Sequence, residues 1–168
     1  MKKNGHLSAT RIIAAKIYSM LPKALKSEVN LVDLQQAAML HDIGKVFIPK
    51  EILYKQGALT QREKEIMNLH AEFSYELLKQ RGIKESVLRL IKYHHQRPDK
   101  TGYPCADEDF EYTLSSQILS AADKYSALTE QRAYHTACTK SEALAIIYED
   151  VDAGVISQEV YDALKKAA

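Results

Sequence analysis

The sequence His41-Asp42-Ile43-Gly44-Lys45 follows an apolar run over residues 34–40, which predicts a buried helix that ends at this point. An imidazole and a carboxylate suit divalent ions such as Mn, Fe and Zn. Neighbouring helical residues point about 100° apart, yet both side chains can reach one ion where the helix ends, and Gly44 is the residue type expected just past a helix end. Lys45 adds a cation that an anionic substrate could meet. An isolated His-Asp pair is more often a solvated helix end, so its interpretation depends on the rest of the chain.

The composition is that of an ordinary globular protein, with 46% hydrophobic and 27% charged residues in a chain of 168. This length predicts a single domain over residues 1–168. The net charge of +1 gives no general attraction for polymeric nucleic acid or an acidic membrane. We expect no membrane segment, because no run approaches 18 apolar residues. Cys105 and Cys138 show no pairing pattern, and no signal-peptide core follows the N-terminus, so we expect a cytoplasmic location.

Helical periodicity recurs along the chain and strand alternation does not, so the predicted fold class is all-α, a compact helical bundle. Capping boxes at Thr60 and Thr139 mark two helix starts. The segment 96–113 contains Pro98, Gly102 and Pro104 and is expected to be a loop. We expect helices over about residues 7–21, 32–43, 60–80, 85–95, 114–129 and 157–167, one more after Thr139, and a short turn over residues 49–53.

Side chains that bind divalent metals accompany these helices. Each one alone has an ordinary structural explanation, such as a polar helix end. Asp123 is the exception, because a carboxylate among small apolar residues needs a partner. Together the set could line one cavity of a helical bundle, as in di-metal carboxylate proteins. The candidates are His6 before the first helix, His41 and Asp42 at the end of the second, His70 inside the long third helix, His94 and His95 at the end of the next, and Asp123.

This ordered set resembles the HD superfamily of metal-dependent phosphohydrolases, and more closely its HD-GYP branch. Residues 94–104 end in the Gly102-Tyr103-Pro104 sequence that names the branch, and residues 123–134 resemble the closing helix of the family. The resemblance extends from His6 to about residue 165. It implies a helical bundle with a central metal site. It also implies hydrolysis of cyclic di-GMP to linear pGpG, and in some members on to GMP, in bacterial second-messenger signalling.

The resemblance also implies roles for individual residues. Asp42 would bridge two divalent metal ions, with Fe or Mn favoured and Zn, Ni or Mg as alternatives. Lys45 would lie beside the scissile phosphate, so that Asp42 and Lys45 are the expected catalytic residues. One ion would be completed by His6, His41 and Asp123, the other by His70, His94 and His95. Substrate contacts would come from Lys45, Tyr103, Arg132 and His135.

The chain departs from the family pattern around the substrate. His135 stands where a Lys or Arg is usual, and because its unperturbed pKa is about 6.5 it is mostly neutral at pH 7, so we expect weak substrate binding. Lys2 stands where some members have a Glu that supports a third metal, so we expect a binuclear centre. The other departures are Gln96 for Glu, Lys100 for Gly and Ser126 for Asp.

Two alternatives remain open from the residues. The chain could be a phosphodiesterase for another cyclic dinucleotide or a nucleotide ester. It could also be a catalytically weak signalling module that binds a ligand or a partner protein. The resemblance further suggests regulation by an upstream receiver or sensor domain, or by a diguanylate cyclase partner.

Overall fold

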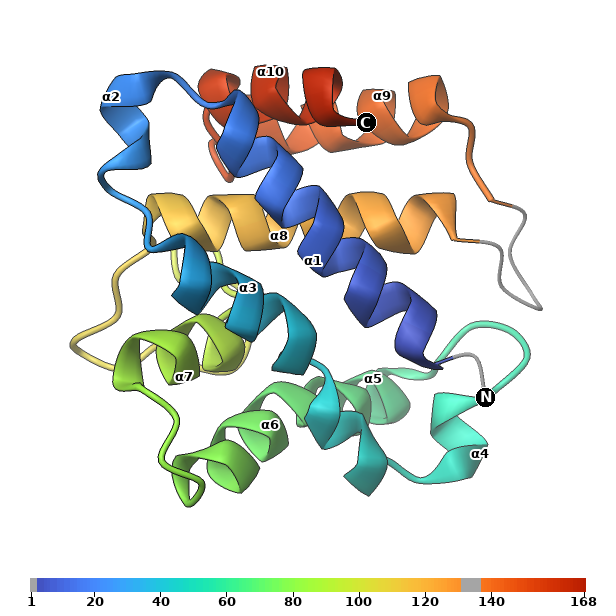
Figure 1. Cartoon of the computed structure of the whole chain (residues 1–168). Coiled ribbons are helices and arrows are strands. Elements are labelled where there is room, and N and C mark those ends of the chain that lie inside the picture. The colour runs from blue at the N-terminus through green and yellow to red at the C-terminus, as the bar shows by residue number, and fades with distance from the viewer. Residues whose placement is uncertain (1–2, 131–136) are drawn as a thin grey trace.

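A long N-terminal helix, α1 (Lys3–Met20), crosses the molecule in Figure 1 and contacts three other helices. These are α3 (Leu31–Leu40), α8 (Leu114–Thr129) and α10 (Gln158–Ala167). The computed structural model describes residues 3–130 and 137–168. Within these residues every regular element is helical, and the only β pairing is one isolated bridge between His95 and Tyr103. The predicted all-α class is confirmed.

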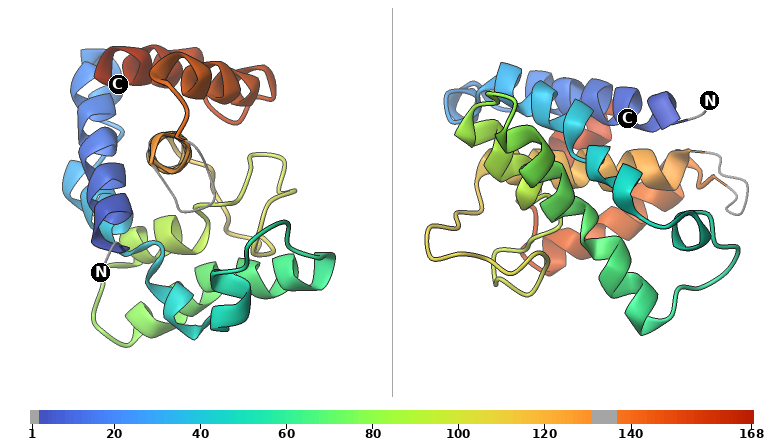
Figure 2. Two further views of the ribbon diagram at one scale, coloured as in Figure 1. Left: turned by 90° about the vertical axis from the view of Figure 1, so that its right-hand side faces the viewer. Right: turned by 90° about the horizontal axis from the view of Figure 1, so that it is seen from below.

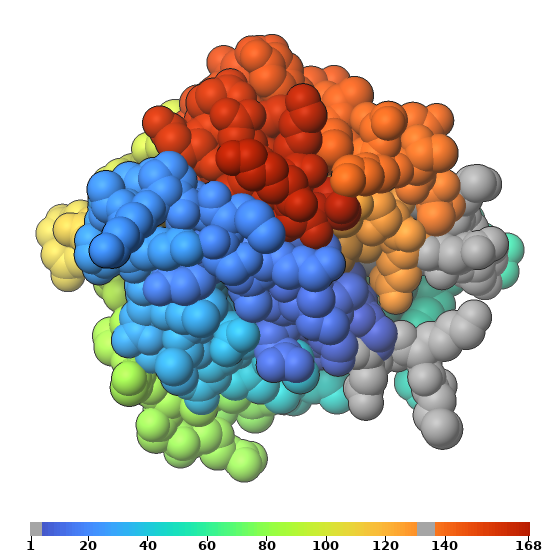
Figure 3. All heavy atoms as spheres, turned by 45° about the horizontal axis from the view of Figure 1, so that its top comes forward, coloured from blue at the N-terminus to red at the C-terminus, as the bar shows by residue number. Residues whose placement is uncertain are grey.

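Helix α8 lies in the middle of the molecule. Seen end-on in Figure 2 (left), it has α1 on one side and α9 (Lys140–Asp152) with α10 above it. Alanines on these helices let their backbones approach closely, and larger aliphatic side chains fill the remaining space. Figure 3 shows α1 and α10 side by side on one face. Fully buried members of this core include Ala14, Ile17, Leu34, Ala37, Ala38, Ile118, Leu119, Ala122 and Leu164.

A second group of short helices packs below α3. Helix α6 (His70–Lys79) contacts both a 3₁₀ helix, η1 (Ile43–Phe47), and α7 (Glu85–Lys92), and α7 also contacts α3. This group brings three chain segments under the end of α3, where the His41-Asp42 sequence lies. The remaining described elements are α2 (Lys23–Lys26), α4 (Lys50–Leu53) and α5 (Gln61–Asn68). None of the described helices combines the length and apolar character needed to cross a bilayer.

Local sequence signals explain most helix starts. The Thr60 and Thr139 side chains accept hydrogen bonds from the third residue of their helices, and the Glu there bonds back, so both predicted capping boxes are confirmed. Asn30 caps α3 by accepting from the amides of Val32 and Asp33, each at 3.1 Å. The short helix α4 follows Pro49, as predicted.

Four helix limits differ from the predicted ones, and each difference moves a predicted ligand. Helix α3, expected to reach residue 43, ends at Leu40, so His41 and Asp42 lie just past it. The helix expected over residues 60–80 is broken at Leu69, whose amide bonds Ile66 in a tight 3₁₀-type turn, so His70 begins α6 instead of lying inside a helix. Helix α7 ends at Lys92, and His94 and His95 lie in the turn beyond it. Helix α1 begins at Lys3, so His6 lies within its first turns and not before it.

A helix ends shortly before Gly44, as predicted, but Gly44 is not the left-handed residue that commonly follows a helix end. Gly44 does not adopt a positive φ; it lies buried in η1. A Cβ at this position would lie 2.2 Å from the carbonyl oxygen of His70 and 2.5 Å from the amide nitrogen of Ser74. Glycine is required here because η1 and α6 touch backbone to backbone.

Candidate metal centre

Five chain segments deliver the predicted ligands to one place. Helix α1 contributes from its first turns and α8 from its interior, and the other three segments contribute at or just past a helix end, where side chains can point along the helix axis. All seven side chains lie within one connected network of contacts. They are His6 from α1, His41 and Asp42 from the end of α3, His70 from the start of α6, His94 and His95 after α7, and Asp123 from α8.

Backbone carbonyls fix the orientation of three imidazoles. Nδ1 of His41, His70 and His94 each donates to the carbonyl oxygen three residues earlier, at 3.0, 2.7 and 2.7 Å. A carbonyl oxygen only accepts, so the proton of each neutral ring is on Nδ1 and the lone pair is on Nε2. Metal-binding histidines commonly donate one ring N–H to a carbonyl oxygen in this way, which directs the other ring nitrogen to the metal.

The Nε2 atoms fixed in this way face one another. Nε2 of His70 lies 3.3 Å from Nε2 of His94 and 3.3 Å from Oδ1 of Asp42. Oδ1 of Asp42 is buried and has no hydrogen-bond partner among the described residues. Lone pairs at this separation repel unless a cation, either a proton or a metal ion, lies between them. The donors therefore fit a bound cation better than they fit each other.

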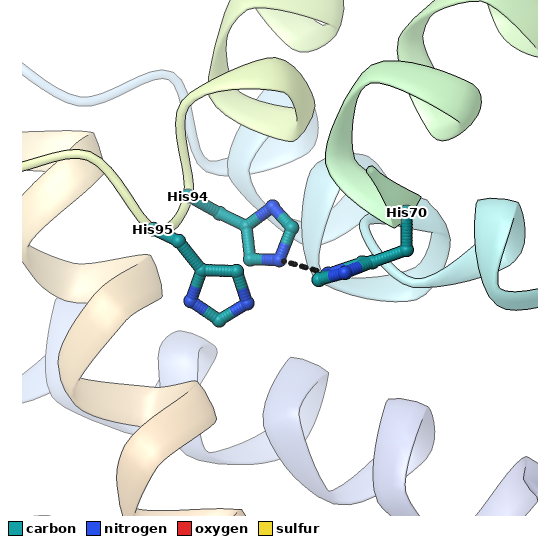
Figure 4. A group of neighbouring side chains, drawn as sticks. All are labelled: His70, His94 and His95. Atoms are coloured by element: carbon teal, nitrogen blue, oxygen red, sulfur yellow. Dashed lines mark hydrogen bonds between the residues drawn. The ribbon is translucent and has the colours of Figure 1, made fainter. Parts of the chain in front are cut away.

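The first ligand group consists of His70, His94 and His95, whose ligand atoms lie within 4.8 Å of one another. Figure 4 shows the three rings converging from α6 and from the turn after α7. His94 and His95 have ring centroids 3.9 Å apart, and Tyr103 covers His95 with centroids 4.7 Å apart. Three imidazole nitrogens suit Fe, Zn, Mn or Ni.

The second group consists of His6, His41 and Asp42, within the same 4.8 Å limit. Oδ1 of Asp123 joins it, at 2.9 Å from Nε2 of His6 and 3.2 Å from Nε2 of His41. Asp42 also faces the first group, because its Oδ1 is 3.3 Å from Nε2 of His70 while its Oδ2 is 3.7 Å from Nε2 of His41. A carboxylate in this position can bridge two ions.

The charges of the site favour cation binding at neutral pH. Burial lowers the pKa of His70 and brings that of His95 to about 4, and burial together with neighbouring histidines holds the pKa of His94 well below 6.5. Burial opposes ionisation of Asp42, but His41 and Lys45 outweigh it and lower its pKa. Metal binding requires neutral imidazoles and ionised carboxylates, and these are the states favoured for these three histidines and for Asp42.

His41 and Asp123 stabilise each other in their charged forms. Burial opposes protonation of His41, but its hydrogen bond to Asp123 and the charges of Asp42 and Asp123 raise its pKa. Burial likewise opposes ionisation of Asp123, and hydrogen bonds from His41 and His6 hold its pKa well below the usual value. A proton on His41 therefore occupies the place that a metal cation would take.

Two predicted substrate contacts lie beside the cluster, and two lie outside the described residues. Nζ of Lys45 donates to Oδ2 of Asp42 at 2.6 Å and its side chain is about one-third exposed. Tyr103 is half-buried beside His95 and His70. Arg132 and His135 belong to residues 131–136, which the structure does not describe, and Lys2 is also outside it.

Ser74 supports the site and was not predicted. Its hydroxyl donates to the carbonyl oxygen of His41 at 2.7 Å and accepts from the amide of Gly44 at 2.8 Å. It therefore fixes the turn that carries Asp42 against α6. The available signal was its position four residues after His70, on the same face of one helix.

Gln96 organises the Gly-Tyr-Pro segment. It is fully buried, its amide group donates to the carbonyl oxygen of Pro104 at 2.8 Å, and its oxygen accepts from the amide of Gly102 at 2.7 Å. A Cβ on Gly102 would lie 2.3 Å from the carbonyl oxygen of His95. The glycine thus allows the loop to fold back on the histidine pair, and Tyr103 follows it onto His95.

Comparison with known proteins identifies the family. The family described as HD domain matches residues 1–156. The chain therefore belongs to the HD domain family, and its Gly102-Tyr103-Pro104 sequence places it in the HD-GYP branch.

Several relatives and one solved structure can be named. The chain is 35% identical over 141 residues to the 3′3′-cGAMP-specific phosphodiesterase 3 of Vibrio cholerae, covering 84% of this chain and 30% of that protein. It is 36% identical over 142 residues to a cyclic di-GMP phosphodiesterase of Thermotoga maritima, covering 83% and 38%. An HDG"Y"P protein from Bdellovibrio bacteriovorus has the same fold, with a TM-score of 0.70 at 16% identity, covering 96% of this chain and 50% of that one. The chain spans about a third of the length of the curated relatives it matches.

Proposed function

We propose that this chain is a metal-dependent phosphodiesterase that hydrolyses cyclic di-GMP to linear pGpG. The observation that supports it most is the convergence of seven imidazole and carboxylate side chains in one buried cluster with Lys45 at its edge. The names of the similar proteins agree with this choice, since they are phosphodiesterases of cyclic dinucleotides.

We assign the ligands as two sets that share Asp42. His6, His41 and Asp123 would hold one divalent ion, and His70, His94 and His95 the other. The nitrogen and carboxylate donors favour Fe or Mn, with Zn, Ni and Mg as alternatives. When bound, two such ions would supply a nucleophile from water at neutral pH and neutralise charge on the phosphate.

The chain's own residues orient and hold the substrate in this proposal. The carbonyls behind His41, His70 and His94 keep each Nε2 directed into the site, so the donors need no rearrangement. Lys45 holds a positive charge beside Asp42, and its partly exposed, flexible stem can turn from that carboxylate towards a phosphate oxygen. It would stabilise charge that develops on the phosphate during cleavage.

The remaining substrate contacts are also part of the proposal. Tyr103 would border the substrate next to His95, and Arg132 would bind a phosphate through its two-pronged guanidinium group. His135 would contribute little charge at pH 7, which predicts weak binding. We further propose that residues 1–168 act as one domain in the bacterial cytoplasm, as the output of a longer chain with a receiver or sensor segment or beside a diguanylate cyclase.

A mixed cyclic GMP-AMP substrate is a second candidate. It is favoured by the similarity to the Vibrio cholerae phosphodiesterase that is specific for 3′3′-cGAMP. The departures at Gln96, Lys100 and Ser126 lie in segments that border the site, so substrate choice can differ from that of the cyclic di-GMP relatives.

The test is a panel of substrates given to Mn- or Fe-loaded protein. Cyclic di-GMP, 3′3′-cGAMP, cyclic di-AMP and a generic aryl phosphodiester are incubated separately, and products are resolved by chromatography with mass detection. We expect linear pGpG as the first product from cyclic di-GMP. Cleavage of the generic ester alone would indicate another hydrolase of this family. Tight binding without any product would indicate a ligand-binding module.

A further inference from the structure

A cavity of about 320 Å³ adjoins the proposed metal centre. His95 and Asp123 form the wall that it shares with the ligand cluster. Arg97 contributes from the segment that follows the histidine pair, and Ser120 and Lys124 contribute from α8. Asp150, near the end of α9, completes the polar lining. A group bound in this cavity would therefore lie next to a phosphodiester held at the ligands.

The volume fits part of a substrate. Small-molecule sites usually measure about 300–1,000 Å³, so this cavity is at the lower limit and suits a base better than a whole cyclic dinucleotide. Ser120 and Ala127 both line it and are seven residues apart on α8, so they lie on the same face of the helix two turns apart. Their small side chains leave room for a flat ring.

Two charged groups of the cavity, Asp150 and Arg97, differ in how firmly neighbouring side chains hold them. Nζ of Lys124 donates to Oδ2 of Asp150 at 2.7 Å, which holds that carboxylate in place. Nε of Arg97 is 3.9 Å from Oδ1 of Asp99, which is longer than a hydrogen bond. The cavity thus combines a fixed carboxylate with a guanidinium group that has only a loose ion pair of its own.

We infer that this cavity binds the guanine base of the substrate, with Arg97 reading one edge and Asp150 the other. Guanine presents the acceptors O6 and N7 on one edge, which match the two-pronged donor of arginine. Its N1–H and N2 amino groups are donors that a carboxylate accepts. Adenine presents an amino donor at C6 and an acceptor at N1, so it would face like groups at both positions. This inference rests on the proposed function and adds the base that the site selects.

The test measures base preference directly by calorimetric binding of GMP and AMP to the metal-loaded chain. Both nucleotides carry the same phosphate, so the difference between them reports the base. We expect GMP to bind on the order of 10- to 100-fold more tightly than AMP, the discrimination typical of a bidentate arginine contact. Equal affinities in the unmodified protein would overturn the inference.

Arg97→Lys and Arg97→Ala distinguish base reading from simple attraction of phosphate. Lysine keeps the charge but lacks the planar fork, so both variants should lose most of the GMP preference. Arg62→Ala is the matched control, because Arg62 is exposed on α5 and away from the cavity, and it should leave the preference unchanged. A preference that persists in both Arg97 variants would contradict the assignment.

Asp150→Asn tests the other edge, with thermal melting to check that loss of the Lys124 ion pair has not unfolded the protein. It should weaken GMP binding and leave AMP binding equal or stronger, because an amide can donate to N1 of adenine where a carboxylate cannot; equal weakening of both would contradict the role of Asp150. The outcomes separate this inference from the proposed function. Base preference dependent on Arg97 without hydrolysis of any cyclic dinucleotide would leave the inference standing and defeat the function. Hydrolysis of a cyclic dinucleotide without any base preference would support the proposed function and defeat the inference.

Discussion

Single hydrogen bonds decide which atoms of this site face inward. The carbonyl oxygens of Ala38, Met67 and Ile91 accept hydrogen bonds from Nδ1 of three histidines. The Nε2 lone pairs of these histidines therefore all face the site. Residue type and order were enough to predict the seven ligand candidates. The supporting contacts could not be predicted in the same way, because Ser74 and Gln96 act through backbone atoms that only the tertiary fold brings near them.

Lys45 and Asp42 should respond differently to removal of their side chains. Lys45→Ala should keep the metal and lose turnover on the order of 10²–10³-fold, the size of one transition-state charge contact. Asp42→Ala should lose both, because Asp42 faces both ligand groups. Elemental analysis and kcat are measured together, with exposed Lys50→Ala as the control. Loss of metal in Lys45→Ala, or an unchanged rate, would show that its proposed role is wrong.

Lys100 has a strained backbone that glycine would relieve. It is the one non-glycine residue with a positive φ, 62°, among the described residues. A side chain in this conformation costs roughly 1 kcal/mol, so Lys100→Gly should raise the free energy of unfolding by about that amount. Lys100→Ala keeps the Cβ and should give no such gain. Urea denaturation of the two metal-loaded variants measures the difference, and equal stabilities would contradict this explanation.

Helices and their starts were more predictable than their interruptions. Apolar periodicity and the capping residues Thr60 and Thr139 located most helices because these signals are local. The break at Leu69 and the end of α7 at Lys92 carry no comparable local signal, and they accompany histidines that turn towards a shared site. The contact of η1 with α6 was not predictable either. In the sequence Gly44 indicates only a helix end, and nothing shows that it packs against α6.

Gly44→Ala should disturb two elements at once. A methyl group 2.2 Å from the carbonyl oxygen of His70 must push η1 away from α6. Overpacking of this kind costs about 1–3 kcal/mol, and it would separate Asp42 from His70, so metal should also be lost. Gly5→Ala is the control, because its new Cβ would meet only an ordinary contact at 3.6 Å. Chemical denaturation and metal analysis test this, and a Gly44→Ala protein with normal stability and metal content would refute the close-contact explanation.

For the whole molecule, burial of the site histidines makes the free energy of unfolding of the metal-free chain depend on pH. Burial lowers the pKa of His70, His94 and His95 in the folded chain, so the unfolded chain binds more protons below about pH 6.5. Stability from these groups is therefore present above pH 6.5 and lost as the pH falls towards 4. His41 has a raised pKa and acts in the opposite sense, but it is one group against three.

The melting temperature of chelator-treated protein should accordingly fall between pH 7 and pH 5. Saturating metal should raise the melting temperature at pH 7, because it binds the folded chain alone. Calorimetry at several pH values with and without chelator measures both effects. A melting temperature that rises on acidification over this range would contradict the protonation states described for the cluster.

The most direct test of a metal-dependent phosphodiesterase is a titration of metal-free protein with Mn or Fe while linear pGpG formation from cyclic di-GMP is followed. The two ligand groups and the cation at Lys2 predict that activity rises from zero to a plateau at about two metal ions per chain. Protein that binds two ions and cyclic di-GMP but releases no product would contradict the central claim. A plateau reached only near three ions would contradict the binuclear site.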